Sequence, residues 1–419
     1  MTQAFSVPPT KSKIKQLLAT GAIGPTFYAL FSKKWFRVAY MFLLTVFFTI
    51  GFLYSVYGRF NLKFNFPGAS VLTFMDSVTY LFLTLANLST VQALWKYEKS
   101  KESIRVLVEY LASKKKKSAI SLTSYIPIAI GFLGLTGNFY AFNPRTFVQM
   151  YQYYVLQDLQ FVYLHFTLLV QIELVNGLRD MFADLNEEFD RSFAGLRKVN
   201  SVIDGVDLFT VANLNAQKPQ WPKIRTIYLF KPANYECLKK LSKKHNDLCH
   251  ITEEFNECVA SIAFVSLIGV IANIIRAVIL FINADIMQIS SSKFDISPQL
   301  PFEAWICNIF YNICWIISMF GQVLLYLTAG HRLESEGNKI TSACTKLLSQ
   351  LSFNDENQQD TFCKQQLILL STQAEARCPV IKGGNGVIIN LSVLGSIVMN
   401  VFAFTVVCTQ FILNDRKRG

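Results

Sequence analysis

The sequence predicts an all-α membrane protein that crosses the bilayer seven times, with its N-terminus in the cytoplasm and its C-terminus outside. Two observations predict this fold. The 419 residues are 52% hydrophobic and only 16% charged, whereas soluble domains have about 25% charged residues. The Lys and Arg residues also gather in alternate segments between long apolar runs, a distribution that reports orientation in a membrane.

Seven apolar runs account for the predicted spans. A helix needs roughly 20 mostly apolar residues to cross the hydrocarbon layer, and its backbone groups must be hydrogen-bonded internally. The runs do not have the short alternating pattern of barrel strands, so we expect helices. The second run contains Asp76 and Asn87, and the fourth contains Asp158, so these two are the least apolar. The predicted spans are residues 38–56, 71–91, 120–140, 154–175, 259–282, 304–327 and 387–413.

The basic residues set the orientation of these spans. Of the 40 Lys and Arg residues, 32 lie in segments on one side, seven lie in segments on the other, and Arg276 lies within a span. Positive charge stays on the cytoplasmic side. The prediction therefore divides the chain into a cytoplasmic N-terminal segment (1–37), spans one to four (38–175), a cytoplasmic loop with helical extensions (176–258), spans five and six (259–328), a second cytoplasmic helical segment (329–386), span seven (387–413) and an extracellular tail (414–419).

This orientation excludes a G-protein-coupled receptor, whose N-terminus lies outside the cell. The characteristic sequences of that class are also missing, since no DRY follows span three and no NPxxY lies in span seven.

The cytoplasmic segments are predicted to be helical as well. Leu178, Met181, Leu185 and Phe189 recur at helical spacing directly after span four. Residues 235–258 and 331–351 have the same pattern, so spans four, five and six are expected to continue into the cytosol and pack as an anchor bundle. Residues 200–232 contain three prolines and are predicted to form a loop.

Catalytic and metal chemistry is not expected. His245 and Cys249 share a predicted helix face, but the chain has no CxxC or HExxH spacing, so a zinc site is disfavoured. We therefore predict no enzyme activity, no metal and no cofactor. The net charge of +12 lies between apolar runs rather than on a soluble face, which argues against nucleic-acid binding.

Polar side chains inside the predicted spans gather toward the outer half of the membrane. Such residues are costly in lipid and by default indicate function, although hydrogen bonding between helices is the alternative. Arg276 needs a carboxylate partner, and Asp76 and Asp158 are the candidates. The predicted aromatic and polar cavity would suit a small organic ligand. Its candidate residues are Asp76, Tyr80, Asn138, Tyr154, Gln157, Asp158, Phe161, His165, Asn273, Arg276, Trp305, Asn308, Tyr311, Asn312 and Trp315.

The end of span seven resembles the insect gustatory receptors. That family ends in Thr-Tyr, five mostly apolar residues and Gln-Phe. Gln410 and Phe411 match at the same spacing, while Ala403 and Phe404 stand where the family has Thr-Tyr. Residues 245–249, 255–256 and 362–367 also look similar to the family. Insect odorant receptors share the topology and are the nearest rival, but they generally lack this ending.

The resemblance implies a ligand-gated, nonselective cation channel in the plasma membrane of sensory neurons. Four subunits would surround a pore lined by span seven, as a homotetramer or with related receptors, and cytoplasmic helices would anchor them. The alternative for the pore face is contact with lipid or packing. The candidate pore residues are Met399, Ala403, Val406, Gln410 and Leu413.

The resemblance also bears on the ligand. Thr405 stands where sugar-sensing members carry Glu, which favours bitter plant metabolites as tastants, although sugars stay open because one sugar-sensing branch lacks that Glu. A seven-span receptor or transporter without its own pore is the alternative from another functional class.

Overall fold

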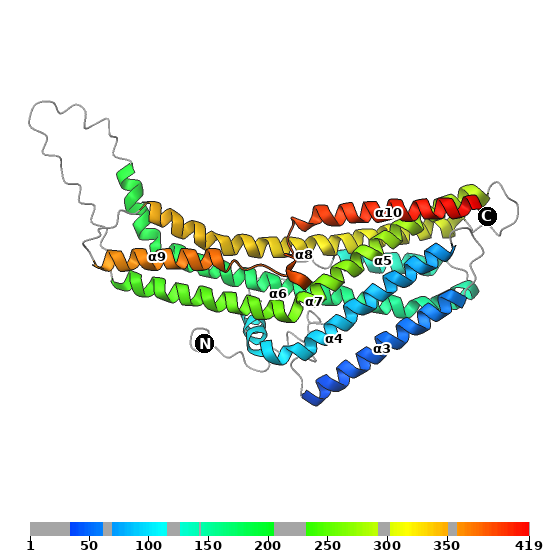
Figure 1. Ribbon diagram of the computed structural model, residues 1–419, viewed down its shortest axis with the longest axis horizontal. Coiled ribbons are helices and arrows are strands. Elements are labelled where there is room, and N and C mark those ends of the chain that lie inside the picture. The colour runs from blue at the N-terminus through cyan, green and yellow to red at the C-terminus, as the bar shows by residue number, and fades with distance from the viewer. Residues whose placement is uncertain are drawn as a thin grey trace, which may run out of the picture. The chain divides into compact units, whose positions relative to one another are not determined.

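The computed structural model describes residues 34–61, 69–114, 126–141, 144–204, 232–291, 302–350 and 358–418. These residues are almost entirely helical (Figure 1). Within them, the isolated antiparallel bridge between Lys382 and Ile388 is the one β-type pairing. The all-α prediction is therefore confirmed. The helices are α3 (Lys34–Asn61), α4 (Ala69–Lys114), α5 (Ile126–Ala141), α6 (Pro144–Asp204), α7 (Pro232–Ser291), α8 (Phe302–Gln350), α9 (Gln358–Ala376) and α10 (Val393–Arg418), with a 3₁₀ turn η3 (Gly384–Gly386).

Each predicted span coincides with one helix. Spans one, two and four to six lie within α3, α4, α6, α7 and α8. Span three corresponds to α5, and its first six residues lie outside the described chain. Four described helices, α3, α6, α8 and α10, are long and apolar enough to cross a membrane, and a bent pair of segments in α7 makes a fifth. The described part of α5 has 16 residues, and polar residues such as Asp76 make α4 less apolar.

The predicted start of span seven is wrong by six residues. The prediction placed it at residue 387, whereas α10 begins at Val393. The Asn390 side chain accepts a hydrogen bond from the Ser392 backbone N–H at 3.0 Å, as an N-capping residue does. Residues 381–389 form a turn, in which the Gly383 N–H donates to the Val387 carbonyl at 2.6 Å. At the other end, α10 continues to Arg418, so residues 414–418 of the predicted tail are helical.

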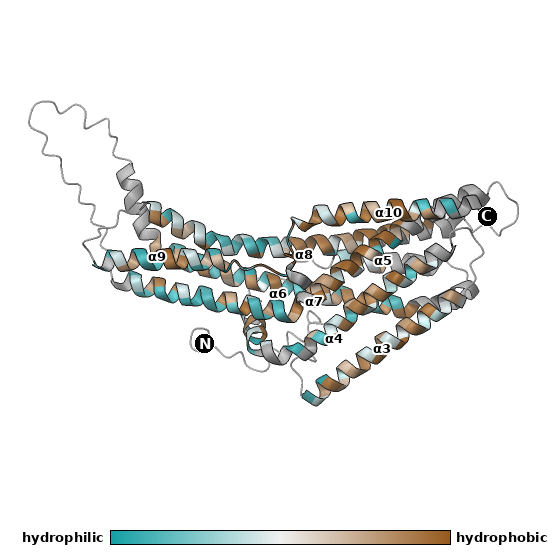
Figure 2. Cartoon of the chain, in the orientation of Figure 1, coloured by the Kyte–Doolittle hydropathy of each residue, from teal (hydrophilic) through white to brown (hydrophobic). Residues whose placement is uncertain are grey.

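The chain divides into two compact units. The described residues of the first unit are 176–204, 232–253, 332–350 and 358–380, and those of the second are the remainder. The first unit falls within the two segments predicted to be cytoplasmic, and Figure 2 shows many hydrophilic residues along its helices. Its place relative to a membrane stays a prediction.

The first unit has a core built from the apolar faces of four helices. Leu178, Leu185 and Phe189 of α6 are buried, as their spacing predicts, together with Leu241 of α7 and Leu367 of α9. The helices α6, α7 and α8 each contribute residues to both units, and α7 is bent between Val259 and Ile262. The predicted helical extensions are thus present in the fold.

Arg377 fixes the end of α9 in the first unit. Its guanidinium donates to both carboxylate oxygens of Glu253 on α7, at 3.1 and 2.5 Å, and forms a hydrogen bond with Asn246. The hydrogen bonds and the charge of Glu253 raise the pKa of Arg377 further above its ordinary value. This pairing links the carboxyl end of α9 to α7.

Candidate functional site

His165 of α6 is the centre of the site to which the predicted ligand residues contribute most. Its ring is stacked on Trp315 of α8, with centroids 5.7 Å apart and planes 15° apart. Phe161, one turn earlier in α6, packs against the same indole at 5.0 Å. Tyr311 meets that indole edge to face at 6.0 Å. Four predicted residues from two helices therefore form one aromatic cluster.

A hydrogen bond between α6 and α8 holds the histidine. The Nδ1 atom of His165 pairs with Oε1 of Gln322. The Gln322 Nε2 group donates to the backbone carbonyl of His165 at 3.5 Å. Both side chains are buried, and burial strengthens the contribution of such bonds. Gln322 was not among the predicted site residues, although an amide inside the apolar sixth span is a signal that could have drawn attention to it.

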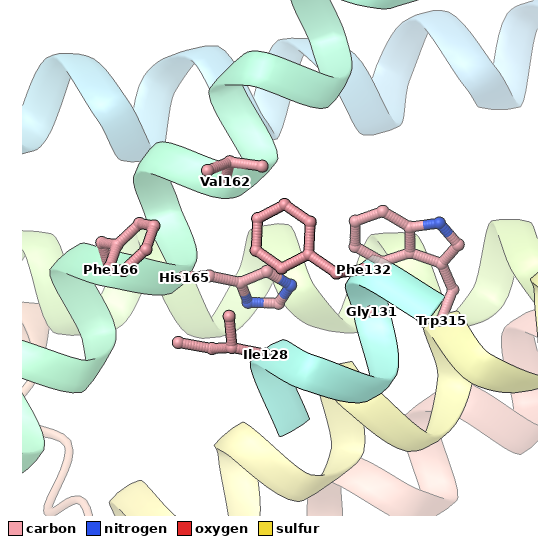
Figure 3. Close-up of a pocket in the computed structure, with 7 residues that line it drawn as sticks. All are labelled: Ile128, Gly131, Phe132, Val162, His165, Phe166 and Trp315. Atoms are coloured by element: carbon pink, nitrogen blue, oxygen red, sulfur yellow. The ribbon is translucent and has the colours of Figure 1, made fainter. Parts of the chain in front are cut away.

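A small cavity opens beside this pair, within the second unit (Figure 3). Its volume is about 10 Å³, enough for about one water molecule. Figure 3 shows the imidazole of His165 among side chains from α5 and α8. The lining residues are Ile128, Gly131, Phe132, Val162, His165, Phe166 and Trp315.

Gly131 allows α5 to approach this cavity closely. A Cβ atom at Gly131 would lie 3.0 Å from Oγ of Ser318 and 3.9 Å from Nε2 of His165. The Ser318 hydroxyl is itself held by the Pro127 carbonyl, to which it donates at 2.6 Å. A side chain at position 131 would therefore crowd Ser318 and narrow the cavity next to the histidine.

A second group of predicted residues is charged. Asp76 of α4 and Arg276 of α7 form an ion pair, with the two side chains 6% and 15% exposed. Tyr311 lies within electrostatic range of Asp76, Arg276 and Asp158. The ion pair confirms Asp76 as a partner of Arg276. Because Tyr311 also contacts Trp315, the charged group and the aromatic cluster share one residue.

Tyr80 belongs to a different network from the one predicted. Its hydroxyl accepts a hydrogen bond from Nε2 of Gln160 at 3.3 Å. The same amide nitrogen donates to the Phe48 carbonyl of α3 at 3.3 Å. The Gln160 Oε1 atom accepts from Thr84 at 3.1 Å and from Asn87 at 3.4 Å. The amide thus joins α3, α4 and α6, which is a packing role.

The other predicted ligand residues contribute less. Asn273 donates its amide to the Gly269 carbonyl of its own helix at 3.1 Å, and Gln157 is buried. Five predicted side chains lie outside the described residues, although their backbones are helical. These five are Asn138, Tyr154, Trp305, Asn308 and Asn312.

Comparison with solved structures identifies the architecture. The insect olfactory receptor OR5 from Machilis hrabei, solved in complex with eugenol, is similar over 90% of this chain and 90% of its own, with a TM-score of 0.52 and 11% identity. The fold is that of the insect olfactory receptors. The structure of OR5 described without a named ligand matches over 90% of this chain and 89% of its own, with a TM-score of 0.48 and 11% identity. No family model and no curated protein matches the sequence.

Within this insect receptor fold, α10 is the least buried of the four described helices that are long and apolar enough to cross a membrane. Of its most apolar 18 residues, 11% are buried, compared with 72% for α6. Its inner face carries Ile397 and Cys408, which are buried. The opposite face is exposed and contains four of the predicted pore residues, Met399, Ala403, Val406 and Gln410. The side chain of the fifth, Leu413, lies outside the described residues.

The exposed side of α10 also carries three polar residues that were not predicted, Ser396, Asn400 and Asn414. Together with the predicted Gln410 they are exposed and fall on one side of the helix, at successive spacings of four, ten and four residues. The signal was present in the sequence, because an amide in an apolar span is costly against lipid. The exposed small or apolar residues Ala403 and Val407 lie between the two polar ends of this stripe.

Proposed function

We propose that the chain is a subunit of a ligand-gated, nonselective cation channel of the insect chemoreceptor type. A small organic molecule would bind beside His165, and cations would pass along the exposed face of α10. The observation that carries this proposal is the stripe of Ser396, Asn400, Gln410 and Asn414 on the face of α10 that no other described part of the subunit covers.

The composition of this stripe favours water over lipid. An amide facing hydrocarbon costs free energy because lipid offers it no hydrogen-bond partner. Asn400 donates to the Ser396 carbonyl of its own helix at 2.7 Å, which satisfies only part of its capacity. A pore that is polar at both ends and apolar at Ala403 and Val407 fits a gate that closes by dewetting. Rings of these residues from several subunits would form that gate.

A pore along one helix requires several copies of the chain, and α9 supplies a candidate contact. Phe362, Ile368 and Leu369 of α9 are between 45% and 48% exposed. Exposed apolar patches of this kind indicate interaction sites. We propose that α9 joins copies of the chain, as a homotetramer or with related subunits.

The coupling between ligand and gate would run through α8. This helix carries Trp315 in the wall of the cavity, Gln322 in contact with His165 and, two turns further on, Gly330. A Cβ atom at Gly330 would lie 2.1 Å from the Ile389 carbonyl oxygen, so α8 touches the backbone that leads into α10. A ligand can open the gate only if it binds one arrangement of this contact more tightly than the other.

Two classes of ligand are proposed, tastants and odorants. The resemblance of Gln410 and Phe411 to the gustatory ending favours a taste receptor for bitter plant metabolites, and sugars are the alternative tastants. The structural match favours the olfactory alternative, since OR5 was solved with eugenol. In either case the proposed ligand is a small organic molecule, and the proposed location is the plasma membrane of sensory neurons.

Whole-cell recording in cells that express only this chain tests the proposal. Compounds from a panel of tastants and odorants should evoke cation current that persists when G-protein signalling is blocked. Gln410→Glu should raise the permeability of calcium relative to sodium, because it adds a ring of negative charge. Phe402→Ala, on the flank of the exposed face, is the matched control and should leave the permeability ratio unchanged. A ligand response that requires G proteins would instead support a receptor without its own pore.

A further inference from the structure

We propose, on the basis of the proposed function, that the cavity beside His165 selects neutral ligands carrying a small hydrogen-bond donor, with a hydroxyl group on an aromatic or aliphatic body as the preferred class. The donor would bind to the Nε2 atom of His165. The proposal rests on the hydrogen bonds that fix the imidazole, on the burial of Nε2 and on the walls of the cavity.

The hydrogen bonds to Gln322 determine which imidazole nitrogen carries the proton. The Gln322 amide nitrogen faces the His165 carbonyl at 3.5 Å, so its oxygen faces Nδ1. A carbonyl oxygen only accepts, and Nδ1 must therefore be the N–H donor. In a neutral imidazole the other nitrogen, Nε2, is then an acceptor with a free lone pair. The lining of the cavity has no carboxylate that would stabilise a charged imidazolium.

The acceptor is left without a partner in the described part of the chain. The Nε2 atom is buried and makes no hydrogen bond there, and His165 as a whole is 4% exposed. Buried polar atoms in native proteins are nearly always paired, and an exception calls for an explanation such as a bound ligand or water. The cavity next to Nε2 has room for about one water molecule or one polar group of that size.

The surroundings of the acceptor define what else the ligand can contain. The other walls are the apolar side chains of Ile128, Phe132, Val162 and Phe166 together with the Trp315 ring. An ether or carbonyl oxygen in this position would meet the lone pair of Nε2 without a proton between them. A hydrocarbon would leave Nε2 unpaired, and sites built to bind a hydroxyl group reject analogues without one. A hydroxyl group satisfies both the acceptor and the apolar walls.

Matched pairs of compounds test the inference on the purified, full-length protein in detergent. Each pair replaces a hydroxyl by a methyl group of similar size. The pairs are phenol and toluene, 4-methylphenol and 4-methyltoluene, and benzyl alcohol and ethylbenzene. The shift in unfolding temperature, measured against free aqueous concentration, gives the affinity of each compound. We expect the hydroxyl compound to bind about tenfold more tightly in at least one pair, which corresponds to one buried hydrogen bond.

Two substitutions locate the effect at Nε2. His165→Asn keeps an N–H group where Nδ1 lies and removes the acceptor, so the preference for the hydroxyl compound should disappear. His165→Gln is the matched control, since its longer side chain can place an amide oxygen near the position of Nε2 and should retain a preference. Equal binding within every pair, absence of binding by all six compounds, or a preference that survives His165→Asn would overturn the inference. The comparison of pairs in the unaltered protein does not depend on the folding of either variant.

This experiment separates the inference from the proposed function. A hydroxyl preference in a protein that never conducts current would sustain the His165 site and refute the channel. Ligand-evoked current accompanied by equal binding within all pairs would sustain the channel and refute the site.

Discussion

The carboxylate of Asp76 in α4 forms an ion pair with the guanidinium of Arg276 in α7; the Asp76 side chain is buried, and that of Arg276 is 15% exposed. Taking either charge away leaves the other in a low-dielectric environment without its partner. Asp76→Asn should therefore destabilise the protein by about 3–5 kcal/mol, measured as a loss of thermal stability in detergent.

The double variant Asp76→Asn with Arg276→Met is the control for this prediction. It removes both charges and keeps a long apolar side chain in α7, so it should recover most of the lost stability. Additive losses from the two single variants would show that the two residues are not coupled.

Gln160 is predicted to hold α3, α4 and α6 together through its amide. Gln160→Leu would remove the bonds to Phe48, Tyr80 and Thr84. Hydrogen bonds between membrane helices contribute about 0.6–1.7 kcal/mol each, so the variant should unfold at a lower temperature by an amount corresponding to about 1–3 kcal/mol in total. Gln92→Leu replaces an exposed glutamine of α4 and should have little effect. Equal stability of Gln160→Leu and the unaltered protein would refute the packing role.

Gly330 should not tolerate a side chain, because the Ile389 carbonyl oxygen would lie 2.1 Å from the added Cβ atom. That oxygen belongs to the backbone before α10 and cannot move aside as a flexible side chain could. Gly330→Ala should therefore reduce both thermal stability and ligand-evoked current. Gly395→Ala is the matched control, since a Cβ atom there meets nothing within 4 Å, and alanine favours the helix. Normal current from Gly330→Ala would rule out the close contact between α8 and this segment.

His245 in the first unit should make stability depend on pH. Burial, together with the charge of Arg377, lowers the pKa of His245 from 6.5 to about 4. The unfolded chain therefore binds a proton at a higher pH than the folded protein does. The stability that buried, neutral His245 contributes is fully present above pH 6.5 and is lost as the pH falls to about 4. This contribution to the free energy of unfolding is about 3 kcal/mol at most. Thermal unfolding between pH 8 and pH 4 measures it, and His245→Phe should flatten the profile.

Cys249→Ala provides the comparison for the histidine variant. Cys249 lies one turn along α7, with its sulfur 3.6 Å from Nδ1 of His245, and burial raises the pKa of its thiol to about 12. The loss of this side chain should lower stability by the same amount at every pH in the range. A profile for His245→Phe as steep as that of the unaltered protein would assign the pH dependence to other groups.

The helices could be predicted from the sequence because apolar length and spacing report directly on burial in lipid and in the core. Leu178, Leu185 and Phe189 are buried as their spacing predicts. The start of α10 could not be predicted in this way. Residues 387–389 are as apolar as a span, but they pair with residues 381–383 in a turn, and Asn390 then caps the helix.

The sequence predicted which residues belong to the site better than it predicted the contacts between them. Arg276 could be limited to two carboxylates, and the packing of α4 against α7 selects Asp76. The distance between α6 and α8 cannot be read from the sequence, so the pairing of His165 with Gln322 is seen only in the structure. Tyr80 likewise carries no local signal that it would contact Gln160 rather than the cavity.

The orientation of the chain across the bilayer decides which end of α10 and which part of α6 face the exterior. It rests on the distribution of 32 and seven basic residues on the two sides of the spans. Epitope tags before Met1 and after Gly419, stained with antibody on intact and permeabilised cells, measure it without any agonist. The C-terminal tag should stain on intact cells, and the N-terminal tag should stain only after permeabilisation. Staining of both tags under the same condition, or the reverse pattern, would contradict an inverted seven-span receptor.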